Sequence, residues 1–478
     1  MDGHDGRALA FGDVTEELSV ELDVEGEVPG WLDGALVRNG PGRFSFPDTS
    51  VDHWFDGLAM LRKFAVRDGR VVYRNRFLDT EAYRNARRGR YEGGFGTEST
   101  RGAARQVLGL LIGERGTDNT NVNVWRYAGE YVALTETPNL TTFDPETLAT
   151  TGRTGYLGDP EGQHVTGHPH HDRERGETVG FSTRFGREPA YRLWRQPDDR
   201  WGRETIGTVR ADEPAYMHSF GLTDRYVVLT EFPLVASPLD LLRPGAASFI
   251  ERFDWRPARG TRIHVLDRAS GGRVARPTAA PCYGFHHVNA YDDGDVIVAD
   301  LVTFPDADAV SSLYFEDLAD PDGDWSFDGG RLTRYRIDPA AGTVDEREIH
   351  GGHVGLPRIS PDVYRRRHRY VYGQGERGQP VTELPGEVLK IDVETGGATA
   401  YRREDAFVSE PVFVPRPDGD REDDGVVFAV FLVPDAERSE LVVLDGRSMD
   451  ELARAPLPHA LPLDFHGQWL PEVGDPAL

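Results

Sequence analysis

Four of the 15 histidines occur in similar sequence contexts that could together bind a metal ion. They are His168 in VTGHPHHD, His218 in AYMHSFGLTDRYVVL, His286 in GFHHVNAYDDGDVIVADL and His466 in PLDFHGQWLP. After the first three, a polar turn and then an apolar run follow at a similar distance. Neutral imidazole is a ligand for iron, zinc, copper and nickel, whereas a site without cysteine excludes soft thiolate chemistry. We therefore treat the four as candidate metal ligands, although any one alone is better explained as an ordinary loop or core residue.

Two glutamates could support such a site by hydrogen bonding to its histidines. Glu136 in VALTETP and Glu410 in VSEPVFVP stand at the predicted starts of two further β-hairpin units. A metal-bound imidazole usually donates its second N–H to a carboxylate, which fixes the tautomer and increases ligand basicity. A buried glutamate is costly elsewhere but expected beside such a histidine. Taken singly, each of the two could equally be a surface carboxylate.

The elements that would position these residues are short β-hairpins. An alternating apolar run that ends in Asp is followed by a polar or glycine-rich turn and a second run. This pattern recurs at Asp68, Asp144, Asp198, Asp267, Asp338, Asp392 and Asp445. The intervals of 50 and 68 residues between His168, His218 and His286 match the 54 and 69 residues between three of the hairpins. Seven hairpins at this spacing predict an all-β, seven-bladed β-propeller, in which equivalent positions face one axis. An irregular β-sandwich is the alternative.

Two long insertions between the hairpins could cover one end of this propeller. Residues 92–117 and 234–256 contain or overlap the apolar stretches 105–116 and 233–250. These stretches could form a small helical cap, or a surface that contacts a membrane and admits a lipophilic substrate. Because no shift in composition divides the chain, we interpret residues 1–478 as one domain.

The composition argues against several classes of protein. The 80 acidic and 54 basic residues give a net charge of −26, so we expect no nucleic-acid binding. Only Lys63 and Lys390 are lysines, and an acidic, lysine-poor surface suits concentrated salt, where charges are screened. With Cys282 as the single cysteine, no intramolecular disulfide can form. The N-terminus has no signal-peptide pattern, and the longest apolar run, 426–433, is too short to span a bilayer. We therefore expect a cytoplasmic protein of a halophile.

The same segments resemble the carotenoid cleavage oxygenase family. Besides the histidine segments, the resemblance rests on RNGPGRF (38–44), HWFDGLAML (53–61), TETP, LPRI (356–359) and SEPVFVP, all in the family's order. It implies a seven-bladed β-propeller with a small helical cap formed by insertions between blades. It also implies one non-haem Fe(II) per chain, held by the four residues His168, His218, His286 and His466.

The resemblance further implies roles for neighbouring residues. Glu136 and Glu410 match glutamates that hydrogen-bond to iron-bound histidines. Within the pair His286 and His287, the family's ligand lies three residues before the asparagine that is Asn289 in this chain. We therefore expect His286 to be the ligand and His287 to be a bystander.

Two positions depart from the family pattern. The family's third supporting glutamate belongs just before GLPRI, and that position is Gly355 in this chain. One ligand, which we take to be His286, is therefore expected to lack its usual carboxylate partner. Val122 stands in TDNTNVNVW, where several family members have threonine near the open iron positions. Valine at this position resembles the animal retinoid and β-carotene branch.

The resemblance implies oxidative cleavage of a conjugated C=C bond in a carotenoid or apocarotenoid, with O2 as co-substrate and two carbonyl products. An apolar tunnel should set specificity, because a polyene offers few hydrogen bonds. The alternatives within the fold are cleavage of a stilbene or phenylpropanoid and a retinoid isomerohydrolase-like reaction. A zinc hydrolase or a non-catalytic binding propeller fits four aligned histidines less well. Since such substrates partition into membranes, we expect peripheral membrane contact through 106–112 and 233–250; the oligomeric state is left open.

Overall fold

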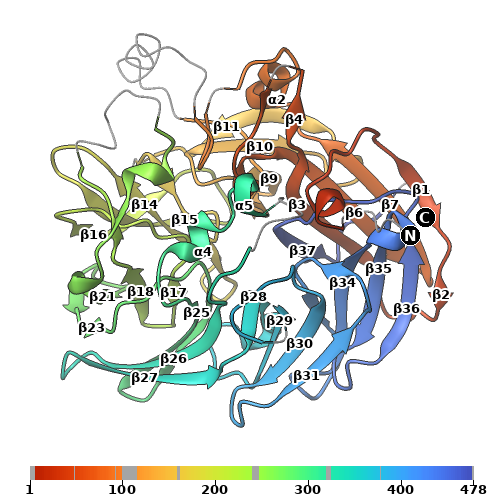
Figure 1. Ribbon diagram of the computed structural model, residues 1–478. Coiled ribbons are helices and arrows are strands. Elements are labelled where there is room, and N and C mark those ends of the chain that lie inside the picture. Colours follow the sequence, from red (N-terminus) through yellow and green to blue (C-terminus); the bar gives the residue numbers. More distant parts are fainter. Residues whose placement is uncertain are drawn as a thin grey trace.

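The computed structural model of the chain is a β-propeller, shown in Figure 1. It describes residues 6–47, 49–91, 93–98, 116–158, 162–238, 247–318, 325–376 and 378–475. Within these residues, seven antiparallel sheets of four or more strands form blades around a central axis. The colours in Figure 1 show that the chain visits the blades in sequence order. The predicted seven-bladed, all-β architecture is confirmed.

The strands of each blade follow one another from the axis outward. In this order, blade 1 contains β37 (His466–Leu470), β3 (Gly34–Arg43), β6 (Leu58–Arg67), β7 (Arg70–Phe77) and β1 (Ser19–Leu22). Blade 2 contains β8 (Asn123–Tyr127), β9 (Glu130–Leu134), β10 (Asn139–Phe143) and β11 (Thr150–Gly155). Blade 3 contains β12 (His164–Val165) with β13 (His170–Asp172), then β14 (Glu177–Arg184), β15 (Ala190–Pro197) and β16 (Glu204–Arg210). Blade 4 contains β17 (Gly221–Leu222), β18 (Tyr226–Glu231), β21 (Thr261–Asp267), β22 (Arg273–Ala275) and β23 (Thr278–Ala279).

The remaining blades follow the same plan. Blade 5 contains β24 (His287–Asp293), β25 (Val296–Thr303), β26 (Arg331–Asp338) and β27 (Thr343–His350). Blade 6 contains β28 (His353–Arg358), β29 (Tyr370–Glu376), β30 (Glu387–Asp392) and β31 (Ala398–Arg402). Blade 7 contains β32 (Phe407–Val408) with β33 (Val412–Pro415), then β34 (Gly425–Val433), β35 (Arg438–Asp445), β36 (Glu451–Pro456) and β2 (Glu25–Gly26). A small hairpin outside the blades pairs β4 (Ser45–Phe46) with β5 (Thr49–Ser50).

Each of the seven aspartate hairpins joins the third and fourth strands of a different blade. At the β26–β27 turn, Oδ1 of Asp338 accepts hydrogen bonds of 2.9 Å from the N–H groups of Ala340 and Ala341. Asp392 and Asp445 accept from the N–H groups two and three residues further on in the same way. A side chain that bonds its own backbone in this manner stabilises a tight turn. The recurring aspartate is therefore a turn-forming residue, as the sequence pattern predicts.

The last strand of the chain closes the ring. β37 joins blade 1, where His466 pairs with Asn39 and Gly467 pairs with Arg38 of β3. The Arg38 guanidinium is fully buried and forms a bidentate ion pair with Asp464, at 2.6 and 2.7 Å. At the periphery, β2 from the N-terminal part of the chain pairs with β36 of blade 7. The pairing of β37 with β3 therefore places His466 in blade 1.

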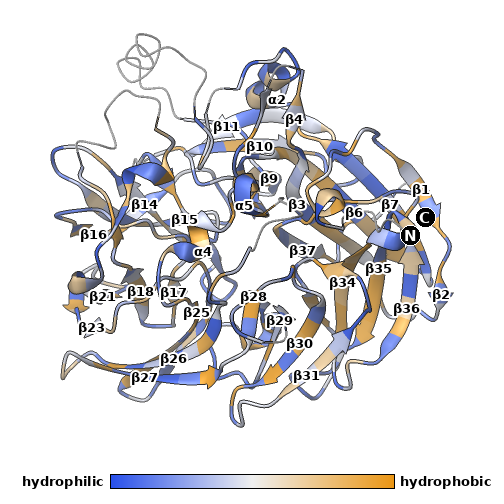
Figure 2. Cartoon of the chain, viewed as in Figure 1, coloured by the Kyte–Doolittle hydropathy of each residue, from blue (hydrophilic) through white to orange (hydrophobic). Residues whose placement is uncertain are grey.

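Figure 2 shows apolar residues along the strands, and the buried clusters include side chains from neighbouring blades. The longest apolar run forms β34, which is buried along all but its last residue. No helix in the described residues has the length and apolar character needed to cross a membrane. Both lysines are buried in ion pairs, Lys63 with Asp475 at 2.8 Å and Lys390 with Asp423 at 2.7 Å. The exposed positive charge therefore comes from arginine, while the halophilic habitat stays a prediction.

The helical cap differs in part from the expected one. Its described helices are α1 (Gly6–Ala10), α2 (Glu81–Ala86), α4 (Asp308–Ser311) and α5 (Phe315–Leu318), with α4 and α5 near the axis in Figure 1. Residues 105–115 of the first expected segment lie outside the described residues. In the second segment, 239–246 also lie outside them, and the described part contains no helix of the expected length. There, β19 (Leu234–Val235) pairs with β20 (Asp254–Trp255), and a 3-10 turn spans Ile250–Arg252. In this described part, Leu234 and Ala236 enter the core from extended chain and Ile250 from the 3-10 turn, while a helix over 239–246 stays a prediction.

Candidate metal centre

The structure brings the four candidate ligands together. One ring nitrogen from each of His168, His218, His286 and His466 lies within 4.8 Å of the corresponding nitrogens of the others. The Nε2 atoms of His168 and His218 are 2.7 Å apart, and those of His286 and His466 are 3.3 Å apart. The cluster therefore presents four nitrogens to one small volume.

Equivalent places in four blades produce this convergence. His168 lies between β12 and β13, His218 precedes β17, His286 precedes β24, and His466 is the first residue of β37. Each of these strands is the one nearest the axis in its blade. Side chains that are far apart in the sequence meet because the propeller repeats the same position around its axis.

The electrostatics of the cluster favour a cation between the rings. Burial lowers the pKa of His168 and His286 well below the usual value, and the neighbouring imidazoles lower it further. Burial also lowers the pKa of His466, although Glu410 opposes this effect. The 2.7 Å between Nε2 of His168 and Nε2 of His218 leaves room for at most one proton, so at least one of these two nitrogens directs a lone pair into the cluster. An all-imidazole donor set of this kind fits a divalent first-row metal such as Fe(II).

Glu136 and Glu410 lie behind two of the histidines. Oε1 of Glu136 is 2.7 Å from Nδ1 of His218, and Oε1 of Glu410 is 2.8 Å from Nδ1 of His466. When Nδ1–H donates to the carboxylate, Nε2 keeps the lone pair that faces the cluster. The two glutamates therefore fix the tautomer that a metal ligand requires.

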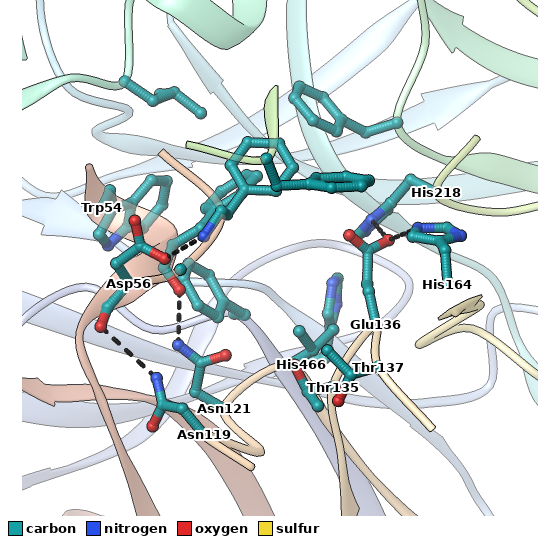
Figure 3. Close-up of a pocket in the computed structure, with 18 of the residues that line it drawn as sticks. Trp54, Asp56, Asn119, Asn121, Thr135, Glu136, Thr137, His164, His218 and His466 are labelled. Atoms are coloured by element: carbon teal, nitrogen blue, oxygen red, sulfur yellow. Dashed lines mark hydrogen bonds and ion pairs between the residues drawn. The ribbon is translucent and has the colours of Figure 1, made fainter. Parts of the chain in front are cut away.

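Several groups keep the Glu136 carboxylate ionised. Burial would raise its pKa, but its contacts with the imidazoles of His218 and His164 outweigh burial and hold the pKa below its usual range. The hydroxyl of Tyr216 donates to Oε2 at 2.8 Å, and Nε2 of His164 lies 3.5 Å from Oε1. Figure 3 shows His164 and His218 both directed at Glu136. The carboxylate is thus held between three polar side chains.

Glu410 is compensated by a different set of groups. Burial would raise its pKa, but the Arg358 charge and His466 lower it. Oε2 accepts the N–H of Gly467 at 2.8 Å, and Nε of Arg358 lies 3.5 Å from Oε1. Arg38 donates to the Glu410 carbonyl oxygen at 2.8 Å. The RNGPGRF and LPRI motifs therefore act by placing cations around one buried glutamate.

The sequence analysis missed several of these residues and misplaced one. Glu410 lies at the inner edge of blade 7, between β32 and β33, as expected. Glu136 follows β9, the second strand of blade 2, and not the start of that blade. Its carbonyl oxygen accepts the N–H of Val165 in blade 3, which explains how a residue between β9 and β10 reaches the axis. The position of Tyr216, two residues before His218, could have indicated that it lies near the cluster. Nothing in the sequence indicated this for His164.

His286 has no hydrogen-bonded carboxylate among the described residues. Gly355 occupies the position where the family pattern has its third glutamate. A Cβ atom added to Gly355 would lie 2.7 Å from Nε2 of Gln374. Gln374 thus fills the space beside Gly355, and both line the same cavity as His286. The other noted departure, Val122, packs against Gly167, because a Cβ there would lie 2.8 Å from its Cγ1.

A cavity of about 1380 Å³ opens on one side of the cluster. His218, His286 and His466 are among its lining residues. Aromatic side chains form much of its wall, namely Phe55, Phe95, Phe249, Phe285, Phe304, Trp325, Phe327 and Phe465. A wall of this kind binds a lipophilic molecule mainly through its shape.

The HWFDG segment supplies part of this wall. The Asp56 carboxylate accepts the N–H of Thr97 at 2.7 Å, which ties the segment to a neighbouring loop. Asn121 donates to the carbonyl oxygens of Phe55 and Gly57, at 2.8 Å each. These polar contacts therefore hold the aromatic side chains of the segment against the cavity.

Known proteins are similar to this chain in sequence and in fold. The family described as "Retinal pigment epithelial membrane protein" matches residues 11–471. The chain belongs to this family, the carotenoid oxygenases. "Carotenoid-cleaving dioxygenase, mitochondrial" of Macaca fascicularis is 29% identical over 95% of this chain and 92% of its own length. "Carotenoid cleavage dioxygenase 8, chloroplastic" of Arabidopsis thaliana is 32% identical over 96% of this chain and 84% of its own.

Solved structures agree with this membership. A mutant of the Synechocystis apocarotenoid oxygenase has a TM-score of 0.84 and 27% identity, covering 97% of this chain and 98% of its own. The cobalt-substituted form of that oxygenase has the same TM-score and coverage at 28% identity. The carotenoid oxygenase fold therefore extends over almost the whole chain.

Two other histidines of this carotenoid oxygenase lie near the cluster but are fully hydrogen-bonded elsewhere. Nδ1 of His287 is 2.9 Å from the Ser219 hydroxyl, and its Nε2 is 2.9 Å from the Thr230 hydroxyl. Nε2 of His170 is 2.8 Å from the carbonyl oxygen of Phe220, and its Nδ1 contacts the Tyr364 hydroxyl. Neither belongs to the cluster of converging nitrogens.

These buried histidines predict that stability falls in mild acid. Burial lowers the pKa of His287 to about 3 and that of His170 to about 4. Between these values and the unfolded value of about 6.5, the unfolded chain binds more protons, so unfolding becomes easier as the pH falls. Each group should cost about 2 kcal/mol of unfolding free energy between pH 7 and pH 5. Denaturant unfolding of the metal-free protein at both pH values measures this, and His287→Gln should remove one group's share. An equal pH dependence in that variant would contradict the account.

Proposed function

We propose that this protein is a non-haem Fe(II) dioxygenase that cleaves a conjugated C=C bond of a carotenoid or apocarotenoid with O2, giving two aldehyde or other carbonyl products. The observation that carries the proposal is that three of the four clustered histidines, His218, His286 and His466, line the aromatic cavity. The dioxygenase names of its relatives support the reaction class.

In this proposal, His168, His218, His286 and His466 hold the iron. Bound iron would supply the activation of O2 that oxidative cleavage of a C=C bond requires. Because all four ligands are uncharged, the site keeps the full charge of the metal. Each supporting glutamate accepts the Nδ1 proton of its histidine, which directs the lone pair of Nε2 inward.

The residues of the cavity wall bind and orient the substrate. Its aromatic side chains bind the polyene by shape and contact area, exclude water, and position one double bond beside the cluster. No described charged group is needed to orient the hydrocarbon part of the substrate. The position of the cleaved bond would therefore depend on how far the polyene enters the cavity before its end group contacts the cavity wall.

Product analysis tests this function. Anaerobically purified, iron-loaded protein is offered carotenoids, apocarotenals, stilbenes and retinyl esters, with and without O2, in high salt. We expect aldehyde pairs from a carotenoid or apocarotenal, with O2 consumed. Products from stilbenes alone would instead favour a phenylpropanoid-cleaving enzyme. Isomerised alcohol from an ester without O2 would favour an isomerohydrolase.

We also propose that residues 1–478 form one domain and that the protein is cytoplasmic and contacts the membrane surface peripherally. The β37–β3 closure supports the single domain. Within 233–250, Leu234, Val235 and Ile250 are buried, so these side chains offer no exposed apolar surface. The apolar residues 106–112 and the part 239–246 of the second segment lie outside the described residues, so membrane contact through either stays a proposal. Liposome sedimentation of wild type and of the double variant Leu110→Asp, Leu111→Asp tests the first segment, and equal binding would rule that segment out.

A further inference from the structure

His353 is a polar side chain in the wall of the aromatic cavity, and it lies outside the four-histidine cluster. It is the first residue of β28, the inner strand of blade 6, and is 5% exposed. Its Nδ1 accepts the N–H of Gly330 at 3.0 Å, and the ring makes a T-shaped contact with Phe327. No other hydrogen bond joins this imidazole to a described residue, so its Nε2 is left for a ligand.

The surroundings of His353 determine which ring nitrogen carries the proton. Burial lowers the pKa of His353 to about 4, so the ring is neutral near pH 7. Because the lone pair of Nδ1 accepts the Gly330 N–H, the proton of the neutral ring lies on Nε2. His353 therefore presents an N–H donor to its ligand, and not an acceptor.

Two consecutive glycines bring this backbone N–H to the imidazole. A Cβ added to Gly329 would lie 2.8 Å from Nδ1 of His353, and one added to Gly330 would lie 2.8 Å from the carbonyl oxygen of Val354. Any larger residue would push the segment away from the ring. The N–H of Gly329 donates to Oε1 of Gln379 at 2.8 Å, which holds the segment in place. The orientation of the His353 donor is therefore built into the fold.

A second uncharged polar side chain lies on the same face of blade 6. Gln374 of β29 pairs with Gly355 of β28, and its side chain covers the space that a side chain at Gly355 would occupy. Gly355 is two residues from His353, so both positions lie on one face of β28. Gln374 also lines the aromatic cavity, and no described residue hydrogen-bonds its side-chain amide. We call His353 and Gln374 together the polar subsite.

The charged side chains that line the same cavity are engaged by the protein itself. Each of them contacts backbone groups, side chains or aromatic rings of the chain: Asp56, Glu136, Arg184, Arg203 and Arg252. The polar subsite differs from these residues, because its hydrogen-bonding groups have no such partners.

We propose that the polar subsite binds an oxygen atom of the substrate, so that the preferred polyene carries a hydroxyl, ketone or aldehyde group. This inference rests on the proposed function. Covering the Nε2–H of His353 with hydrocarbon leaves a buried donor unpaired, which costs free energy, whereas an oxygen atom accepts the hydrogen bond. Gln374 can in addition accept a hydrogen bond from a hydroxyl group. Because a few fixed polar groups orient a ligand in an apolar cavity, the subsite would also determine which double bond lies beside the cluster.

Equilibrium binding without O2 tests the subsite in the absence of turnover. Iron-loaded protein is titrated with matched polyenes: a ring-hydroxylated carotenoid against the unsubstituted one, and an apocarotenal against the hydrocarbon with a methyl group in place of the aldehyde. Quenching of tryptophan fluorescence measures binding, since Trp54 and Trp325 line the cavity. His353→Phe removes the Nε2–H donor, and the matched control His353→Gln keeps an N–H donor. Both variants lack Nδ1, so the loss of its contact with Gly330 is common to them.

We expect the wild type to bind at least one oxygenated polyene about tenfold or more tightly than its hydrocarbon partner, because only the oxygen satisfies the His353 donor. His353→Phe should abolish this preference by weakening the binding of the oxygenated polyene alone, and His353→Gln should retain most of it. Gln374→Leu should weaken the binding of the hydroxylated polyene more than that of the apocarotenal, because only a hydroxyl donates to the amide oxygen.

Equal affinities for both members of each pair in the wild type would overturn the inference, and this comparison needs no variant to fold. A preference that survives in His353→Phe would overturn it as well. Both results leave the proposed reaction intact. A wild type that binds no polyene would instead refute the proposed substrate class, and the polar subsite with it.

Discussion

Changing His168, His218, His286 or His466 to Ala is expected to abolish carotenoid cleavage and to remove most of the iron. Each change deletes one of four nitrogens that lie within 4.8 Å of one another, and no other described side chain is positioned to replace it. Metal analysis of the purified variants measures the iron per chain, and product formation measures the activity. Circular dichroism shows whether each variant still folds as a β protein.

The bystander histidines provide the matched control. His287 neighbours a proposed ligand, yet both of its ring nitrogens are occupied by hydroxyl groups. His287→Ala should therefore keep most of the iron, at some cost in stability. Loss of iron in His287→Ala together with full iron in His286→Ala would show that the register assigned to this strand is wrong.

Glu136→Gln and Glu410→Gln are expected to reduce iron retention or turnover by about 10- to 100-fold while the fold is kept. The amide oxygen can still accept from Nδ1–H, but the negative charge that strengthens the histidine as a donor is lost. The effect should be larger at Glu410, because Arg358 and Arg38 would lose the anion that they surround. Chelator competition gives the iron affinity, and steady-state assays separate kcat from KM.

A buried glutamate away from the cluster separates this effect from a general loss of stability. Oε2 of Glu231 lies 3.2 Å from Nε2 of His264 in blade 4, in the same kind of buried pair. Glu231→Gln should lower the unfolding free energy but leave iron affinity unchanged. If Glu136→Gln and Glu410→Gln both retain full activity, the two residues are ordinary structural carboxylates.

The blade architecture was predictable because one local device repeats. Each aspartate turn marks the outer hairpin of one blade, so the number of such turns in the sequence predicts the number of blades. Once the blades are counted, histidines at matching offsets must face the axis, which is why His168, His218 and His286 could be aligned. His466 had no such offset and depended on the family resemblance, since ring closure places it in blade 1.

Contacts between blades were not predictable from the sequence. Glu136 reaches His218 across 82 positions, and Arg38 reaches Glu410 across 372. The residue pattern within a strand does not predict these side-chain contacts, because they depend on which blades are neighbours and on the register between their inner strands. The buried imidazole of His164 was missed for the same reason.

The cap illustrates a different limit. The apolar residues of 233–250 suit a helix by composition, but Leu234 and Val235 form an extended pair with Asp254 and Trp255. Tertiary packing against blade 4 determines their structure, and short apolar runs do not distinguish these outcomes. Gln374 beside Gly355 is a similar case, since only the fold shows which side chain fills the space of a missing one.

The most direct test of the central claim is the location of iron in crystals of the anaerobically purified protein. Anomalous diffraction at the iron absorption edge measures it without reference to activity. The account predicts a single strong peak per chain, surrounded by the Nε2 atoms of His168, His218, His286 and His466. A peak at any other place, one coordinated by His287 or His170, or no peak in iron-replete protein would contradict it.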